Sequence, residues 1–223
     1  MKTNILFIKT AKCATQSIRQ HLFEYAISRG LKVNDANYDN FFLYGPFNIN
    51  TNHILNNDEY QKHFYKEIDK NLPVIRISSV RNPLDRLYSH YCYGHKFFRQ
   101  GLDFNEWYLG QCKGTISDGW ETPHWGDMTD NYMSNYMGIE TLDDIKEKYD
   151  FIFIKEHFSD SLKAFGKLLK FDFKPKSIEN KNPNTNNNYK FDSEVLSLFE
   201  ERNKKDILLY KQVLKEFNDK LIL

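Results

Sequence analysis

The sequence contains no glycine before Gly30, although it has 10 glycines in all. The phosphate loop of ATP- and GTP-binding proteins, G-x-x-x-x-G-K-[ST], needs glycines so that the backbone can wrap around the phosphates. That motif does not occur in the chain, and no acidic cluster suited to magnesium accompanies the N-terminal segment. These absences count against a P-loop small-molecule kinase, which stays open as an alternative.

An excess of charge of one sign is also missing, because 31 basic residues are balanced by 30 acidic ones and the net charge is +1. Such a balance provides no field that would hold nucleic acid or a membrane surface, so we expect no nucleic-acid partner and only a local anion site. Cys13, Cys92 and Cys112 are odd in number and widely spaced, which fits neither a disulfide framework nor a zinc site. We therefore expect a reduced protein without a bound metal.

Long apolar runs are absent as well. None approaches the ~20 residues that a membrane-spanning helix needs, so we expect no transmembrane segment. Residues 1–4 lead into the first apolar run without a cleavable signal sequence, which predicts a cytoplasmic location. The length of 223 residues suits a single domain, residues 1–223, and the sequence indicates no oligomeric state.

What the chain does have near its N-terminus is a short apolar run followed by a helical pattern. Residues 5–8 suit a buried strand, and apolar residues recur through 18–29 at the spacing of a helix with one buried face. The N–H groups of such a helix's first turn would point toward the carboxyl end of the strand and could bind phosphate or sulfate. Lys12, Thr15 and Ser17 add a charge and two hydroxyl groups. An ordinary strand-loop-helix with a solvated lysine remains the alternative.

A second segment repeats this arrangement. Residues 74–80 predict a strand, Asn82 is suited to cap a following helix, and Pro83 is suited to its first position. Arg81 lies at the turn, and Ser89 lies two turns along the predicted helix. A salt-bridged arginine and a helix-surface serine are the alternative interpretation of these two residues.

The two segments resemble, in the same order, the 5′-phosphosulfate and 3′-phosphate motifs of sulfotransferases that use 3′-phosphoadenosine 5′-phosphosulfate (PAPS). Phe7-Ile8-Lys9-Thr10-Ala11-Lys12-Cys13 is most similar to the version of this motif in galactosylceramide and galactose 3-O-sulfotransferases. The chain as a whole most resembles the carbohydrate sulfotransferases of the galactose 3-O and uronyl 2-O type. The resemblance implies that Lys12 is the catalytic lysine and that Arg81 and Ser89 bind the 3′-phosphate. It also implies a set of donor-binding residues in the first loop: Lys9, Lys12, Cys13, Ala14, Thr15, Gln16 and Ser17.

Two further regions supply candidates for the acceptor side of the site. The stretch around His53 is similar to the segment that provides the general base in the same carbohydrate enzymes, although a loop histidine is also an ordinary surface residue. Residues 94–138 are rich in aromatic side chains, most of which we expect in the core. Trp120, His124 and Trp125 are candidate acceptor-binding residues, because sugar faces pack on rings. If His53 is not the base, His124 or His90 is the next candidate.

The rest of the chain adds weaker points of agreement. Residues 149–169 are similar to the family pattern of a strand, Glu-x-Phe, Ser-Leu and a helix, and residues 202–210 resemble its terminal Asn-x-x-Asp-x-x-Leu-Tyr. Lys181 lies in a polar, Asn-rich loop, residues 180–188, whose counterpart closes over the nucleotide in relatives.

Two local expectations concern helix ends. Thr141 and Asp144 look like an N-cap pair, and Asp192 with the residue after it should cap one continuous final helix.

Strands that alternate with helices predict an α/β fold with a central parallel sheet, helices on both faces and ligands at the carboxyl ends of the strands. The resemblance implies the P-loop-like sulfotransferase fold. It further implies that PAPS is the donor, that adenosine 3′,5′-bisphosphate is released without a metal, and that the acceptor is a hydroxyl group of a carbohydrate or glycolipid. A non-catalytic nucleotide- or glycan-binding module is the second alternative beside the kinase.

Overall fold

The computed structural model describes residues 4–30, 71, 73–94, 101–116, 129–174 and 189–221. Within these ranges the strands β1 (Asn4–Phe7), β2 (Val74–Val80) and β3 (Phe151–Ile154) form a parallel sheet in the order β1-β2-β3. Asn4 pairs with Val74 at the start of β1, and Val80 pairs with Ile154 at the end of β3. The predicted α/β class with a parallel sheet is confirmed.

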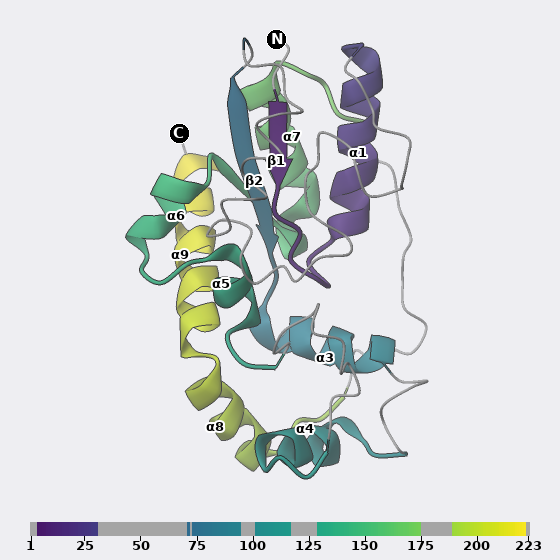
Figure 1. Cartoon of the computed structure of the whole chain (residues 1–223), viewed down its shortest axis with the longest axis vertical. Helices are drawn as coiled ribbons and strands as arrows, with labels where there is room; N and C mark the ends of the chain where they lie inside the picture. Colours follow the sequence, from purple (N-terminus) through teal and green to yellow (C-terminus); the bar gives the residue numbers. More distant parts are fainter. Residues whose placement is uncertain are drawn as a thin grey trace.

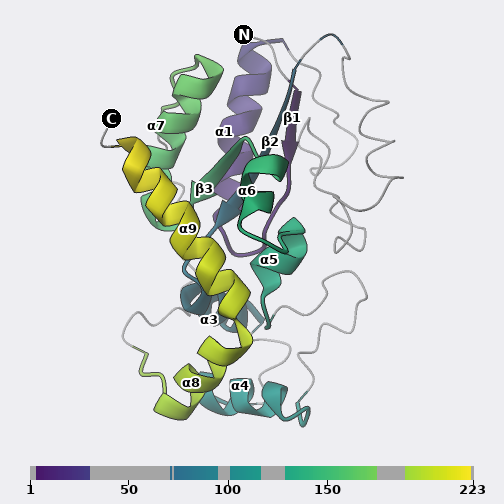
Figure 2. The same cartoon turned by 90° about the vertical axis from the view of Figure 1, so that its left-hand side faces the viewer.

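Helices cover both faces of the sheet (Figures 1 and 2). One face packs against α1 (Thr15–Ser28) and α7 (Phe158–Leu169), and the other against α5 (Tyr132–Met137), α6 (Asp143–Lys148) and α9 (Lys204–Leu221). Successive residues of a strand point to opposite faces. Accordingly, Ile5 and Phe7 belong to the core beneath α1 and α7, whereas Leu6 and Ile8 belong to the core beneath α5 and α9.

A third cluster lies beyond the carboxyl ends of the strands, where α3 (Pro83–Gly94), α4 (Phe104–Cys112) and α8 (Ser193–Arg202) meet (Figure 1). The rings of Phe104, Trp107 and Tyr108 are buried there. These aromatic residues are core, as we expect for most rings in this part of the sequence.

The C-terminal region contains two helices rather than the continuous one predicted, because the chain turns at Asn203 between α8 and α9. The Asn203 side chain donates to the carbonyl of Phe199 over 3.3 Å and accepts from the N–H of Asn131 over 3.0 Å. An asparagine side chain that bonds to backbone groups in this way competes with the helical hydrogen bonds.

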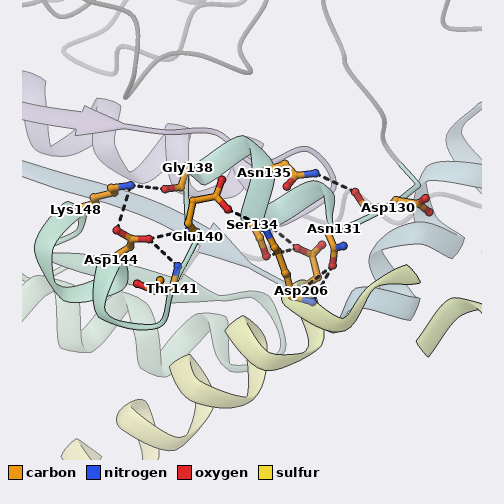
Figure 3. Close-up of polar contacts among 11 residues, drawn as sticks. Asp130, Asn131, Ser134, Asn135, Gly138, Glu140, Thr141, Asp144, Lys148 and Asp206 are labelled. Carbon is orange, nitrogen blue, oxygen red and sulfur yellow. Dashed lines mark hydrogen bonds and ion pairs between the residues drawn. The ribbon is translucent and has the colours of Figure 1, made fainter. Parts of the chain in front are cut away.

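The N-terminus of α6 also differs from the prediction. The N-cap residue is Leu142 rather than Thr141, and it makes no side-chain cap bond. Instead, the carboxylate of Asp144 reaches back and accepts from the N–H groups of Glu140 and Thr141, each over 2.8 Å (Figure 3).

In the described part of the chain, no helix is both long and apolar enough to cross a membrane.

Candidate functional site

The loop after β1 turns sharply although it contains no glycine. Lys12 and Ala14 both adopt left-handed backbone conformations, with φ of 67° and 62°. Side chains disfavour this region by about 1–2 kcal/mol per residue. Two bonds to the carbonyl of Thr10 hold the turn: the Cys13 N–H donates over 3.3 Å and the Thr15 hydroxyl over 2.8 Å. Strained residues that neighbouring bonds enforce are characteristic of ligand sites.

The first turn of α1 opens toward this loop and carries no counter-charge of its own. Its N-cap residue is Ala14, which has no side-chain acceptor for the N–H groups that follow, and no acidic residue lies in the first turn. Helix N-termini with exposed donors attract anions through these groups and the helix dipole. The predicted strand–loop–helix geometry is therefore present, with Gln16 exposed and Ser17 half-buried in the first turn.

Lys12 is held in a partly desolvated position. Its Nζ lies 3.9 Å from the centroid of the Tyr93 ring at the end of α3. Burial, and next the positive charge of Arg81, lower the pKa of Lys12 to about 8. An ammonium group that is poorly hydrated and close to other cations gains more from an anion than a solvated lysine would.

The second loop follows β2 and lies against the first. Asn82 caps α3, because its Oδ1 accepts from the N–H groups of Leu84 over 3.1 Å and Asp85 over 3.2 Å, as predicted. Arg81 points to the first loop, where its Nη1 donates to the carbonyl of Lys12 over 3.3 Å. The Nε–H of Arg81 is buried and has no hydrogen-bond acceptor among the described residues. A buried donor of this kind suits an anion between the loops.

Both loops lie together because β1 and β2 are neighbours in a parallel sheet, so their carboxyl ends share one edge. Thr10 and Ser79 join the ends of the two strands: the Thr10 hydroxyl donates to the carbonyl of Ser79 and lies 3.0 Å from its hydroxyl group. Ser89 lies further along α3 and is 8% exposed, so only a small part of its surface could contact a ligand.

Not every predicted donor-binding side chain faces outward. Cys13 is fully buried, its Sγ lies 3.7 Å from the Sδ of Met133, and burial raises the pKa of its thiol to about 12. Lys9 is also buried, and the hydroxyl proton of Thr15 is used within the loop. Cys13 and Lys9 are therefore poorly exposed to a ligand in solution.

The predicted acceptor and lid residues lie outside the described residues: His53, Trp120, His124, Trp125 and Lys181. The alternative base His90 is described, and it is 3% exposed. Burial, and next the charge of Arg86, lower the pKa of His90 to about 3. A ring that is this inaccessible and this weakly basic is poorly suited to take a proton from an acceptor.

Sequence reasoning missed two residues beneath the first loop. Arg86 is buried, and its Cζ lies 4.7 Å from the centroid of the Tyr132 ring. The hydroxyl group of Tyr132 accepts from the N–H of Ala11 over 3.2 Å. Arg86 is close enough to Lys12 to lower its pKa. In the sequence, only the position of Arg86 directly before the apolar Leu87 indicates that Arg86 is buried. No sequence pattern places Tyr132 near the loop.

We found no matching protein-family profile for the sequence and no curated protein that matches it significantly. Among solved structures, the chain is similar to a sulfotransferase from Alicyclobacillus acidocaldarius, with a TM-score of 0.45, 11% sequence identity and 96% of each chain covered. Among the described residues, no group of three or more His, Cys, Asp or Glu side chains could hold a metal ion.

Proposed function

We propose that this protein is a sulfotransferase that moves a sulfuryl group from PAPS to a hydroxyl group of an acceptor. The observation that carries the proposal is the hydrogen bond from Arg81 Nη1 to the carbonyl of Lys12, which joins the two loops to which we assign anion binding. A nucleotide with phosphates on both the 3′ and the 5′ oxygen of one ribose presents two anions close together. ATP, in contrast, presents its phosphates as one chain.

The residues present fit each half of such a donor. Lys12 and the open first turn of α1 suit the 5′-phosphosulfate, and the buried Nε–H of Arg81 suits the 3′-phosphate together with Ser89. The donor supplies a sulfuryl group attached to a phosphate that can leave. Lys12, Arg81 and Arg86 lie close together at this edge of the sheet, so the charges of both arginines lower the pKa of Lys12.

Lys12 is the group that we propose for catalysis. Its ammonium can neutralise charge on the oxygen that leaves with the phosphate, and preorganised charge of this kind is a large part of catalysis in group transfer. The ring of Tyr93 restricts where the ammonium can go. For the acceptor, we propose His53 as the general base on the basis of the sequence. Trp120, His124 and Trp125 are the residues that we propose to contact a carbohydrate or glycolipid.

The experiment is to incubate the purified protein with ³⁵S-labelled PAPS and a panel of sugars, glycolipids and peptides. We expect label in a hydroxyl-bearing acceptor and stoichiometric release of adenosine 3′,5′-bisphosphate. Lys12→Ala should keep the fold but lose more than about nine-tenths of the turnover, since removing one such charge costs on the order of 3 kcal/mol in the transition state.

Other outcomes would contradict the proposal in distinct ways. Phosphoryl transfer from ATP with magnesium would make the protein a kinase. Binding of the bisphosphate without turnover of any acceptor would make it a nucleotide-binding module, and a Lys12→Ala variant that keeps more than a tenth of wild-type turnover would remove Lys12 from the mechanism.

A further inference from the structure

The loop that contains Arg81 makes a hydrogen bond to another part of the sheet edge, because its backbone donates to the carboxylate of Glu156. Glu156 lies in η2 (Lys155–His157), the single turn directly after β3. Its Oε1 accepts from the backbone N–H of Asn82 over 3.1 Å. Since Asn82 directly follows Arg81, this bond fixes the peptide on which the arginine side chain is mounted.

The same carboxylate is held in turn by the C-terminal helix. The hydroxyl group of Tyr210 on α9 donates to Glu156 Oε2 over 3.2 Å. Burial, and next the charge of Glu156, raise the pKa of Tyr210 to about 12, so its hydroxyl group keeps the proton that it donates. A series of two hydrogen bonds therefore runs from Tyr210 through Glu156 to Asn82.

α9 is itself fixed one turn earlier. The buried carboxylate of Asp206 accepts from the N–H of Met133 over 2.9 Å. It also accepts from the N–H of Ser134 over 2.7 Å and from the Ser134 hydroxyl over 2.6 Å (Figure 3). Asn131, at the N-terminus of α5, accepts in return from the N–H groups of Lys205 and Asp206. These bonds join the start of α9 to α5, one turn before Tyr210.

The charge of Glu156 is unexpected next to the loop of Arg81. A carboxylate beside a loop that binds an anion would oppose that binding by simple electrostatics. Its two oxygens are both used in the bonds to Asn82 and Tyr210, which gives the residue a geometric use that can offset this repulsion.

We propose that Glu156 and Tyr210 are positioning residues of the donor site, which hold the backbone after Arg81 and so aim the arginine at the 3′-phosphate. This inference rests on the proposed function. It assigns a role to residues 149–169, which contain Glu156, and to residues 202–210, which end in Tyr210. Neither Glu156 nor Tyr210 needs to contact the ligand for this role.

The test compares the affinities of adenosine 3′,5′-bisphosphate and adenosine 5′-monophosphate by calorimetry. Tyr210→Phe removes only the hydroxyl group, and we expect it to raise the Kd of the bisphosphate by about 3- to 10-fold, the worth of one hydrogen bond, and that of the monophosphate less than about twofold. The matched control is Tyr149→Phe, which removes a hydroxyl group bonded over 2.8 Å to the carbonyl of Met137, between the C-terminal ends of α6 and α5 rather than at the loops. It should change neither Kd.

A pair of variants at Glu156 separates position from charge. Glu156→Gln keeps an oxygen for the Asn82 N–H and can donate to the Tyr210 hydroxyl, so the preference for the bisphosphate should be retained or increased. Glu156→Ala loses both contacts and should reduce that preference at least as much as Tyr210→Phe.

One result would overturn the inference while the wild-type protein still prefers the bisphosphate: Tyr210→Phe leaves the ratio of the two Kd values unchanged, whether neither nucleotide or both nucleotides bind more weakly. Thermal unfolding of each variant confirms that folded protein is compared. If the wild-type protein itself shows no preference for the bisphosphate, the proposed function fails, and the inference with it.

Discussion

At the scale of single residues, Lys12 combines three properties that a solvated lysine does not have together. Its backbone is left-handed, its ammonium lies over the Tyr93 ring, and burial lowers its pKa to about 8. A group with this pKa is mostly charged at neutral pH and mostly neutral above pH 9. The charge that we assign to the donor site can therefore be removed by titration.

We predict that the affinity for adenosine 3′,5′-bisphosphate falls as the pH rises through about 8. The sign follows from the lowered pKa, since the charged form that attracts the anion exists below that value and is lost above it. Calorimetry between pH 7 and pH 9.5 measures this, a range in which the phosphates keep their charge.

The control for this titration is Lys12→Met, which removes the charge and keeps a long side chain. It should bind more weakly at pH 7 and lose most of the dependence on pH. A wild-type affinity that stays constant across this range, or a Lys12→Met variant that keeps the full dependence, would contradict the role of Lys12.

At the scale of secondary-structure elements, the N-termini of α5 and α9 cap each other. Asp206 of α9 accepts from α5, and Asn131 of α5 accepts from α9. Reciprocal capping of this kind satisfies backbone donors that burial would otherwise leave without acceptors.

We predict that Asp206→Ala lowers the free energy of unfolding by about 3 kcal/mol, because it leaves the buried donors of Met133 and Ser134 without an acceptor. Denaturant unfolding measures the change. The matched control is Asp192→Ala: Asp192 is the N-cap residue of α8 but makes no side-chain cap bond, so its loss should cost less than about 0.5 kcal/mol. Equal losses in the two variants would show that the capping bonds contribute little.

The elements were largely predictable from the sequence where the signal is local. The strand over 74–80 and the helix that begins at Pro83 follow from apolar runs and from Asn82 as a cap. The break at Asn203 was not predictable, because its cause is a bond to Asn131. Apolar residues on both sides of the break keep the helical period, so periodicity alone extends through it.

The same distinction applies to the candidate site. The order of residues places Lys12 and Arg81 at strand ends, and parallel pairing then brings the strand ends together. The contacts of Tyr132 with Ala11 and of Tyr210 with Glu156 join residues far apart in the chain, so no spacing rule reveals them. The burial of Cys13 could not be predicted from the sequence either, since a cysteine in a loop can point into the core or toward the solvent.

At the scale of the whole molecule, a chain with a net charge of +1 concentrates positive charge at one edge of its sheet. Lys12 and Arg81 come from separate loops, and Arg86 lies beneath them in α3. Like charges brought together destabilise a protein unless an anion or a buried carboxylate compensates. Burial lowers the pKa of Arg86, and the carboxylate of Asp206 opposes that shift. The arrangement as a whole favours a ligand with two separate anionic groups.

The most direct measurement is the affinity of wild type and Arg81→Ala for adenosine 3′,5′-bisphosphate and for adenosine 5′-monophosphate, determined by calorimetry. ATP with magnesium is measured separately as a third ligand. We predict that wild type prefers the bisphosphate by at least about tenfold, since a charge-assisted hydrogen bond to the 3′-phosphate contributes about 1.5–3 kcal/mol. Arg81→Ala should lose that preference, because it weakens binding of the bisphosphate far more than binding of the monophosphate. We propose a site for a donor that carries phosphates on the 3′ and 5′ oxygens of its ribose. This proposal would be contradicted if wild type bound the two nucleotides equally, or if it bound ATP with magnesium more tightly than the bisphosphate.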